Sequence, residues 1–283
     1  MQSVRLDRFL ANAGEGTRTE VKKMIRLGMI CVNGRPAGRP EEKIIPSEDT
    51  VTVNGKPVTG RKPVWIMLYK PAGVITATKD NSQSTVLDLM PEEAKGLFPV
   101  GRLDKDTEGL LLLTDEGETA HDLLSPRHHV NKIYEALVEG LITEKEITCF
   151  AEGIGIGDAK KTAPSGLEII KCGFFEELMN EQDPLAQRFG QLSAMPPENT
   201  VVSHVRVIVS EGRYHQIKRM FTAVGSTVLY LKRIGMGRLF LDPMLRPGEY
   251  RALTPEETDL LMRKRHPELK KVDGNDAVKT EKQ

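Results

Sequence analysis

Three acidic side chains crowd one short loop of the sequence, directly before an apolar run. Asp104, Asp106 and Glu108 alternate along the loop, and residues 110–113 are four leucines. A loop that leads into a buried strand is held rigidly, so a carboxylate on it can serve as a nucleophile or a base. The same side chains could instead cap backbone N–H groups in a solvated turn, as Asp commonly does in loops.

The acidic loop also begins like a calcium-binding loop, with Asp104 in the first position. Such a loop ends on a bidentate Glu and takes a further ligand from its ninth position. Asp115 stands where the Glu should be, and Leu112 in the ninth position has no side-chain oxygen. We therefore reject a calcium site, and the remaining chemical use of a rigid carboxylate is as a nucleophile or base.

A basic cluster is the second candidate for chemistry. Residues 211–220 contain Arg213, His215, Lys218 and Arg219 at the expected start of a helix. Such clusters often only solvate a surface. Because this one directly follows a predicted strand, it could instead hold phosphates or neutralise a buried carboxylate, and Arg213 and Arg219 are candidates for RNA contact.

Two further motifs carry weaker signals. Residues 125–135 bring Arg127, His128 and His129 into one loop, and a His pair without Cys or carboxylate at ligand spacing is a weak metal site. An exposed or RNA-contacting loop, with Arg127 and His128 as the contacts, is favoured. The Gly-Ile-Gly-Ile-Gly of residues 153–157 lacks the spacing and the following helix of a dinucleotide loop, so we expect a strand and a turn.

The N-terminal region predicts two short helices followed by short strands. Residues 5–13 and about 19–28 have helical apolar spacing, and the second helix carries a separate basic face at i, i+4 and i+8. That face consists of Arg18, Lys22 and Arg26. Two Asn-Gly turns, at residues 33–34 and 54–55, punctuate apolar strands. Residues 54–63, rich in Gly, Pro and Lys, predict a linker.

The rest of the chain predicts strands mixed with helices and no regular βαβ rhythm. We expect strands near residues 64–69, 109–114, 134–138, 201–210 and 228–231, and a helix from about Arg213 to Gly225 with apolar residues at i, i+3, i+4 and i+7. This mixture favours an α+β domain on a mixed, mostly antiparallel sheet. The charged residues 267–283 predict a disordered tail.

Composition excludes several classes. The chain has 283 residues, 39% hydrophobic and 28% charged, with 40 basic and 40 acidic residues, as in an ordinary globular protein. Its three cysteines form no CxxC pair, and no apolar run reaches the roughly 18 residues of a membrane span. We expect a cytoplasmic protein. The charge is segregated, because residues 1–62 hold 12 Lys/Arg against 7 Asp/Glu, which indicates a basic N-terminal module.

Together these motifs resemble the RsuA-type bacterial pseudouridine synthases, which modify ribosomal RNA. The resemblance rests on residues 4–53, similar to an S4-type RNA-binding module, on residues 101–114 (GRLDKDTEGLLLLT), and on residues 131–134 and 212–220. It implies an S4-like domain at 1–60 and a pseudouridine synthase domain at 64–262. It also implies a monomer that needs no cofactor or metal, and it is strongest for the branch that modifies uridine 516 of 16S rRNA.

The resemblance assigns roles to individual residues. It implies that Asp104 is the catalytic carboxylate, either attacking the nucleotide or abstracting a ribose proton, and that Lys218 is the cation that keeps it ionised. Tyr134 would stack on the uracil and take the C5 proton, beside the apolar Ile217. Arg102 would fill the space left by a flipped uridine or bind a phosphate. Phosphate contacts would come from the S4-like helix through Arg18, Lys22 and Arg26.

One segment departs from the family pattern. Residues 173–200 are longer and more acidic than the short hairpin expected there, which predicts a tolerated surface insertion or, near the cleft, a change of target. Two other functions compete with the synthase. A ribosome-assembly factor could bind rRNA through the S4-like module and keep an inactive catalytic fold, and a metal-dependent hydrolase could be built on the acidic loop.

Overall fold

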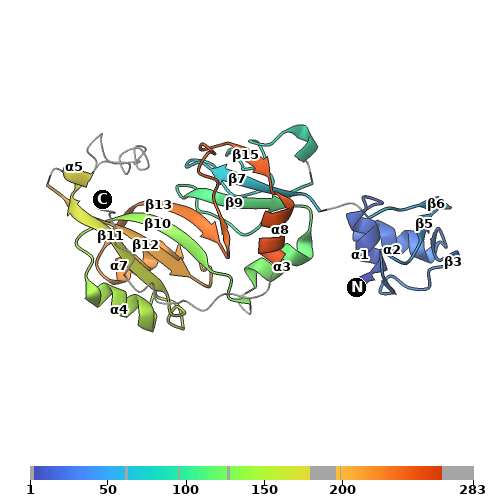
Figure 1. Ribbon diagram of the computed structural model, residues 1–283, viewed down its shortest axis with the longest axis horizontal. Helices are drawn as coiled ribbons and strands as arrows, with labels where there is room; N and C mark the ends of the chain where they lie inside the picture. Colours follow the sequence, from blue (N-terminus) through green and yellow to red (C-terminus); the bar gives the residue numbers. More distant parts are fainter. Residues whose placement is uncertain are drawn as a thin grey trace, which may run out of the picture.

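The computed structural model describes residues 3–60, 63–94, 96–125, 128–178, 196–197 and 199–262 (Figure 1). Arg127, residues 267–283 and most of the acidic segment 173–200 lie outside the described residues. The elements fall into a small N-terminal group and a larger group built on one long sheet.

The N-terminal group packs two helices against short strands around a core of its own. A capping box between Thr17 and Glu20 begins the second helix, and Val21 and Ile25 anchor it in that core. Its basic residues lie away from the core: Arg18 and Arg26 are exposed, and Lys22 is half-buried. The elements are β1 (Val4–Arg5), α1 (Leu6–Asn12), α2 (Arg18–Arg26), β2 (Ile30–Val32), β3 (Arg35–Pro36), β4 (Lys43–Ile44), β5 (Val51–Val53) and β6 (Lys56–Pro57).

The larger group is built on a sheet in the order β11-β12-β10-β13-β9-β7-β15, with β14 beside β13 and β8 beside β9. Every strand pair described in it is antiparallel except β9 with β13, so the predicted α+β class with a mixed, mostly antiparallel sheet is confirmed. The strands are β7 (Trp65–Lys70), β8 (Phe98–Pro99), β9 (Glu108–Thr114), β10 (Lys132–Glu139), β11 (Gly166–Phe174), β12 (Val201–Val209), β13 (Thr227–Met236), β14 (Leu239–Phe240) and β15 (Tyr250–Ala252).

The parallel pair joins the two halves of the sheet over a very short length. β9 and β13 match only at Glu108 with Lys232 and at Gly109 with Arg233. Gly109 has φ +103°, and a Cβ there would lie 2.2 Å from the carbonyl oxygen of Arg233, so only glycine allows this approach. The loop that precedes β9 is thereby held at the centre of the sheet.

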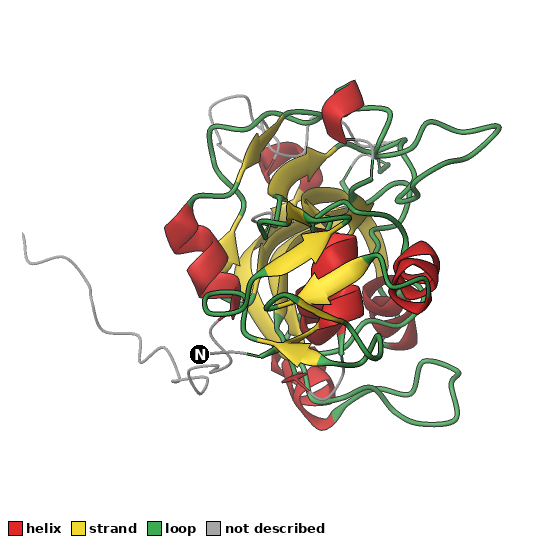
Figure 2. Ribbon diagram, turned by 90° about the vertical axis from the view of Figure 1, so that its right-hand side faces the viewer, coloured by secondary structure: helices red, strands yellow, loops and turns green. Residues whose placement is uncertain are grey.

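Helices pack against the long sheet (Figure 2). Phe150 of α4 and Met220 and Phe221 of α7 share a core with β10, β12 and β13. Leu123 of α3 and Leu261 of α8 share another with β7 and β9. The helices are η1 (Glu92–Ala94, a 3-10 turn), α3 (Gly117–Leu124), α4 (Glu144–Glu152), α5 (Phe175–Leu178), α7 (Gln216–Ala223) and α8 (Pro255–Met262).

Most of the strongly patterned segments form the elements expected of them, and one expectation needs correction. Residues 153–157 contain no strand: residues 153–156 have no regular secondary structure, and a bend begins at Gly157. The strand β11 and the helices α3, α4 and α8 were not expected. Within the described part of the chain, none of the helices combines the length and the apolar character that crossing a membrane requires.

Candidate active site

A cavity of about 600 Å³ opens where β9 and β13 meet. Four segments line most of it: the loop of residues 101–107, residues 209–218 at the end of β12 and the start of α7, and the strands β10 and β13. The sequence motifs at 101–114, 131–134 and 212–220 therefore meet in one place. Of the predicted site residues, the cavity brings together Arg102, Asp104, Tyr134, Arg213, Ile217 and Lys218.

The loop that carries Asp104 is fixed by hydrogen bonds to the segment after β7. The hydroxyl of Thr76 donates to the carbonyl of Leu103 (2.8 Å) and accepts from its N–H (3.1 Å). The N–H of Gly73 donates to the carbonyl of Lys105 at 2.8 Å. A loop tied down on both sides of Asp104 presents that carboxylate in a defined position, which catalysis requires.

Lys70 fixes the same loop through a second set of hydrogen bonds. Its Nζ donates to the carbonyls of Pro71 (2.9 Å), Lys105 (3.2 Å) and Thr107 (2.9 Å), and its side chain is fully buried. Burial lowers the pKa of Lys70 to about 8, although nearby acidic side chains oppose the shift. From the sequence, no role was predicted for Lys70, which directly follows the strand expected near residues 64–69.

The charged groups around Asp104 differ in one respect from the expected pairing. His215 Nε2 lies 3.5 Å from one Asp104 oxygen, and Lys218 Nζ lies 3.8 Å from the other. Lys218 is much closer to Asp106, at 2.5 and 2.6 Å from its two oxygens. Partial burial favours the neutral form of Asp106, but the hydrogen bond and charge of Lys218 outweigh it and lower the pKa of that carboxyl.

An apolar wall faces these charges. Tyr134 on β10 packs against the cores of both sheet halves, and Ile217 is 4% exposed in the first turn of α7. Leu103 and Leu231, both buried, also line the cavity. A cavity with a rigid carboxylate, cations and an aromatic ring suits a planar, partly polar group such as a nucleobase.

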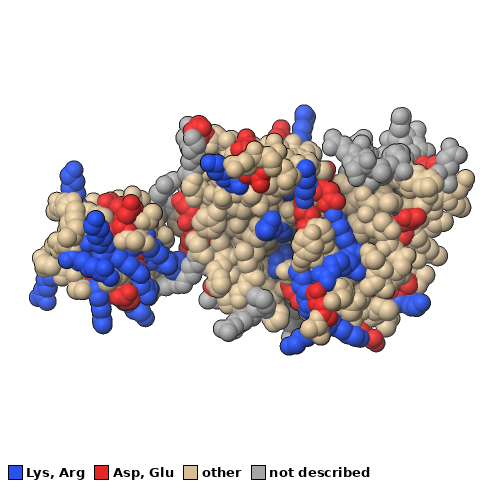
Figure 3. All heavy atoms as spheres, turned by 180° about the vertical axis from the view of Figure 1, so that it is seen from behind, with Lys and Arg blue, Asp and Glu red and all other residues tan. Residues whose placement is uncertain are grey.

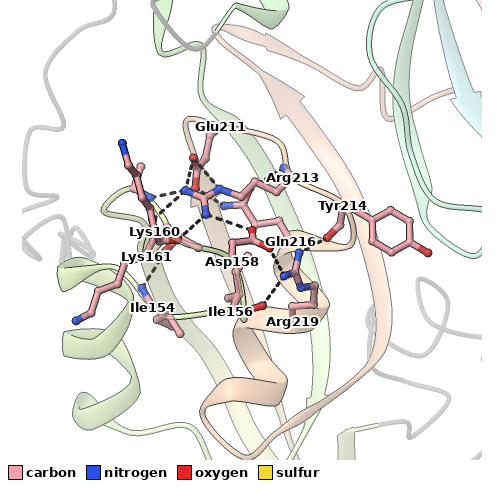
Figure 4. Close-up of polar contacts among 12 residues, drawn as sticks. Ile154, Ile156, Asp158, Lys160, Lys161, Glu211, Arg213, Tyr214, Gln216 and Arg219 are labelled. Carbon is pink, nitrogen blue, oxygen red and sulfur yellow. Dashed lines mark hydrogen bonds and ion pairs between the residues drawn. The ribbon is translucent and has the colours of Figure 1, made fainter.

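Arg213 and Arg219, expected to contact RNA, are bound to the loop between α4 and β11 (Figure 4). Arg213 donates to the carbonyls of Lys160 and Lys161, both at 2.8 Å, and pairs with Glu211. Arg219 pairs with Asp158 at 2.5 Å and donates to the carbonyl of Ile156. Both side chains stay partly exposed, and only Arg213 lines the cavity.

The other expected RNA contacts lie at or beyond the rim. Arg102 is exposed on the cavity edge, whereas His128 lies in the turn after α3 and is bonded through Nδ1 to the carbonyl of Asp122 at 2.8 Å. Arg127 is outside the described residues. The N-terminal group carries many Lys and Arg side chains on the face shown in Figure 3.

Two buried cationic residues that line the cavity, Lys132 and Arg233, were not assigned to the site from sequence, and His215 was expected only as a member of the basic cluster. Lys132 stands two residues before Tyr134 on a strand, which puts both on one face, so a signal for it existed. Arg233 carried no such signal, because only the register between β10 and β13 places it there. In the part of the chain that the structure describes, no group of three or more His, Cys, Asp or Glu side chains could hold a metal ion.

Comparison with known proteins then assigns the family. Residues 64–223 match the RNA pseudouridylate synthase family, and residues 4–50 match the S4 domain. The chain belongs to the RNA pseudouridine synthases. Its place among the RsuA-type members, with an S4 domain ahead of the catalytic domain, agrees with the resemblance inferred from the sequence motifs.

Relatives cover nearly the whole chain. YtzG, an uncharacterized RNA pseudouridine synthase of Bacillus subtilis (strain 168), is 44% identical over 91% of this chain and 98% of its own length. The ribosomal small subunit pseudouridine synthase A of Escherichia coli (strain K12) is 36% identical over 90% of this chain and 98% of its own length. A crystal structure of a pseudouridylate synthase superposes with a TM-score of 0.58 at 32% identity, covering 91% of this chain and 99% of that one.

Proposed function

We propose that this synthase converts one uridine of small-subunit ribosomal RNA to pseudouridine, at uridine 516 in standard bacterial numbering. The 36% identity to the Escherichia coli enzyme named for the small ribosomal subunit supports this substrate. The observation that carries the reaction is the cavity that Asp104 shares with Tyr134, with Lys218 Nζ and a ring nitrogen of His215 within 4 Å of the carboxylate.

The roles follow the chemistry of the reaction. The bond between ribose C1′ and uracil N1 breaks, the detached base turns, and C5 bonds to C1′ with loss of the C5 proton. Asp104 attacks the nucleotide or abstracts a ribose proton, and for either it must be ionised, which Lys218 favours. Tyr134 stacks on the base and accepts the C5 proton. Arg102 occupies the space that the flipped uridine leaves.

The S4 domain supplies affinity in this proposal. Arg18, Lys22 and Arg26 follow one side of α2 and are exposed or half-buried, so they can contact phosphates without reading sequence. Arg213, Arg219, Arg127 and His128 remain proposed as further RNA contacts.

The decisive experiment measures tritium release from small-subunit rRNA that carries [5-³H]uridine, with the modified position mapped afterwards. Asp104→Asn keeps the shape of the side chain and removes its charge, so turnover should fall by more than about 10³-fold while RNA affinity stays the same. Residual activity within about tenfold of the wild type would contradict the role of Asp104.

The same assay separates the other possibilities. No release by the wild type, from naked rRNA or from a partly assembled subunit, would favour the assembly factor. Modification of a different uridine would leave the reaction intact and overturn the 516 target. Activity that survives excess EDTA would exclude the metal-dependent hydrolase.

A further inference from the structure

Two cationic side chains lie buried in the floor of the cavity. Lys132 on β10 is 6% exposed, and Arg233 on β13 is 2% exposed. Arg233 is the direct cross-strand partner of Tyr134, and Lys132 stands two residues before Tyr134, so all three side chains share one face of the sheet. All three line the cavity together with Asp104.

Neither cation has a carboxylate partner among the described residues. Arg233 donates through Nε to the carbonyl of Leu110 at 2.8 Å, and its Nη2 is buried without a hydrogen bond. Glu211, the acidic residue that interacts with Lys132 at longer range, is engaged by Arg213, Gln216 and the N–H of Ala163. Burial and the charge of Arg233 lower the pKa of Lys132 to about 8. Leaving buried charges unpaired is costly, which indicates that a ligand completes the site.

The position of Lys132 and Arg233 indicates that their ligand is the uracil base and not a phosphate of the RNA backbone. The cations lie beside the ring of Tyr134 at the base of the cavity, whereas Arg102 and Lys218 are more exposed and nearer its rim. A base that stacks on Tyr134 brings its carbonyl oxygens to this floor. A phosphate linked to the rest of the RNA would have to enter the most buried part of the cavity to reach the same groups.

We propose that Lys132 and Arg233 stabilise the negative charge that the uracil ring acquires during the reaction, by donating hydrogen bonds to O2 and O4. When the C1′–N1 bond breaks, its electron pair stays on N1 and is shared with both oxygens. When C5 then bonds to C1′, the ring gives up that charge, and the C5 proton leaves to a base. The inference rests on the proposed function, in which Asp104 and Tyr134 hold the reacting uridine.

This role is independent of how Asp104 acts. Attack on C1′ and abstraction of a ribose proton both expel the uracil as an anion. Attack on C6 instead moves the electron pair of the C5–C6 double bond onto C5 and O4. In each case donors that are fixed before the reaction and shielded from water lower the barrier, because the protein needs no rearrangement to meet the charge.

The test compares uridine with 5-fluorouridine at the target position, in single-turnover reactions of wild type and Lys132→Met. The disappearance of each nucleoside is followed by mass spectrometry of nuclease digests. Fluorine withdraws electrons and makes the uracil ring a better leaving group. Lys132→Met should slow the reaction of uridine by about 10²- to 10³-fold, and the deficit should shrink by about tenfold or more with 5-fluorouridine.

Several controls make the result decisive. The ratio of the two substrates is taken on one protein preparation, so the folded fraction of the variant cancels. Lys132→Arg keeps the charge and should recover most of the rate, and Lys145→Met, on the exposed face of α4, should match the wild type. An Arg233→Lys variant should show a smaller deficit than Lys132→Met, because it keeps the charge and loses only the planar donor.

The outcomes that overturn the inference are distinct from failure of the proposed function. An equal deficit of Lys132→Met on both substrates would show that the leaving group is not what Lys132 stabilises. A loss confined to the RNA dissociation constant would identify a phosphate contact instead. A wild type inactive on every RNA tested would overturn the proposed function itself, whereas an active wild type matched by Lys132→Met would overturn only this inference.

Discussion

The carboxylate of Asp104 lies near a histidine and a lysine without a short bond to either. His215 and Lys218 stand at 3.5 and 3.8 Å, while Lys218 is bonded to Asp106 at 2.5 Å. Asp106 therefore holds the lysine in place and leaves the oxygens of Asp104 available to a substrate. Catalytic contacts in free enzymes are often long and shorten only when the substrate binds.

Substitutions at Tyr134 test the proposed mechanism, because its ring and its hydroxyl have separate proposed roles. Tyr134→Phe keeps the ring that stacks on the base and removes the proposed acceptor of the C5 proton. Turnover should fall by about 10²- to 10⁴-fold. In a single turnover, uridine should disappear faster than tritium is released, because the proton stays on C5 after C5 has bonded to C1′.

A matched variant tests the ring itself. Tyr134→Leu should lose stacking as well, which weakens binding of the flipped base by about 1–3 kcal/mol. Tritium release by Tyr134→Phe that keeps pace with uridine loss, at the wild-type rate, would show that another group removes the proton.

At the scale of elements, the loop of Asp104 depends on a strand that contributes no catalytic residue. β7 ends in Lys70, whose buried ammonium bonds three carbonyls at and near the loop. Holding a charge in this place costs stability, and the pKa of Lys70 is accordingly lowered to about 8. The carbonyls recover part of that cost and make the loop rigid.

This buried lysine predicts a pH dependence of unfolding. Between pH 8 and about 10.5 the unfolded chain binds more protons at Lys70 than the folded protein does, so stability rises with pH in that window. The contribution should be about 2 kcal/mol from pH 8 to pH 9.5. Urea unfolding of wild type and Lys70→Met across this range measures it.

The comparison isolates Lys70 because Lys132, whose pKa is also about 8, is present in both proteins. The free energy of unfolding should rise less with pH in Lys70→Met than in the wild type. Parallel pH curves for the two proteins would show that the buried ammonium does not titrate as proposed.

At the scale of the whole molecule, the proposed function assigns affinity and chemistry to different groups of elements. The S4 domain carries the basic face of α2, and the cavity lies between the two halves of the long sheet. An ion pair of 3.7 Å between Arg8 of α1 and Glu116, just before α3, connects the two groups. Because the two functions are assigned to different groups, mutations on the basic face of α2 should change RNA affinity and leave the single-turnover rate unchanged. Mutations of Asp104 should do the reverse.

Replacement of Arg18, Lys22 and Arg26 by Ala tests this separation. RNA affinity should fall, and the slope of log K against log salt should decrease in magnitude by about 2 to 3. The reason is that binding of the variant forms fewer phosphate contacts and therefore releases fewer counterions from the RNA. The single-turnover rate at saturating RNA should stay unchanged. Asp104→Asn is the converse control, with a normal salt slope and no turnover. An unchanged salt slope in the triple variant would place the phosphate contacts elsewhere.

Contiguous motifs were predictable from the sequence because local rules govern them. The acidic loop before β9, the apolar spacing of α7 and the capped helix α2 depend on residues within a few positions of one another. Weakly patterned elements such as β11 were missed, because its exposed and half-buried residues show little alternation.

The sequence by itself therefore determined the family and the division into an S4 domain and a synthase domain, and it predicted Asp104 as the catalytic carboxylate. The tertiary structure decided which distant side chains meet. Lys132 and Arg233 are about a hundred positions apart, and only the pairing of β10 with β13 puts them beside Tyr134. The close pairing of Lys218 with Asp106 likewise depends on how α7 sits over the loop. Such contacts arise from strand register and packing, which local sequence does not specify.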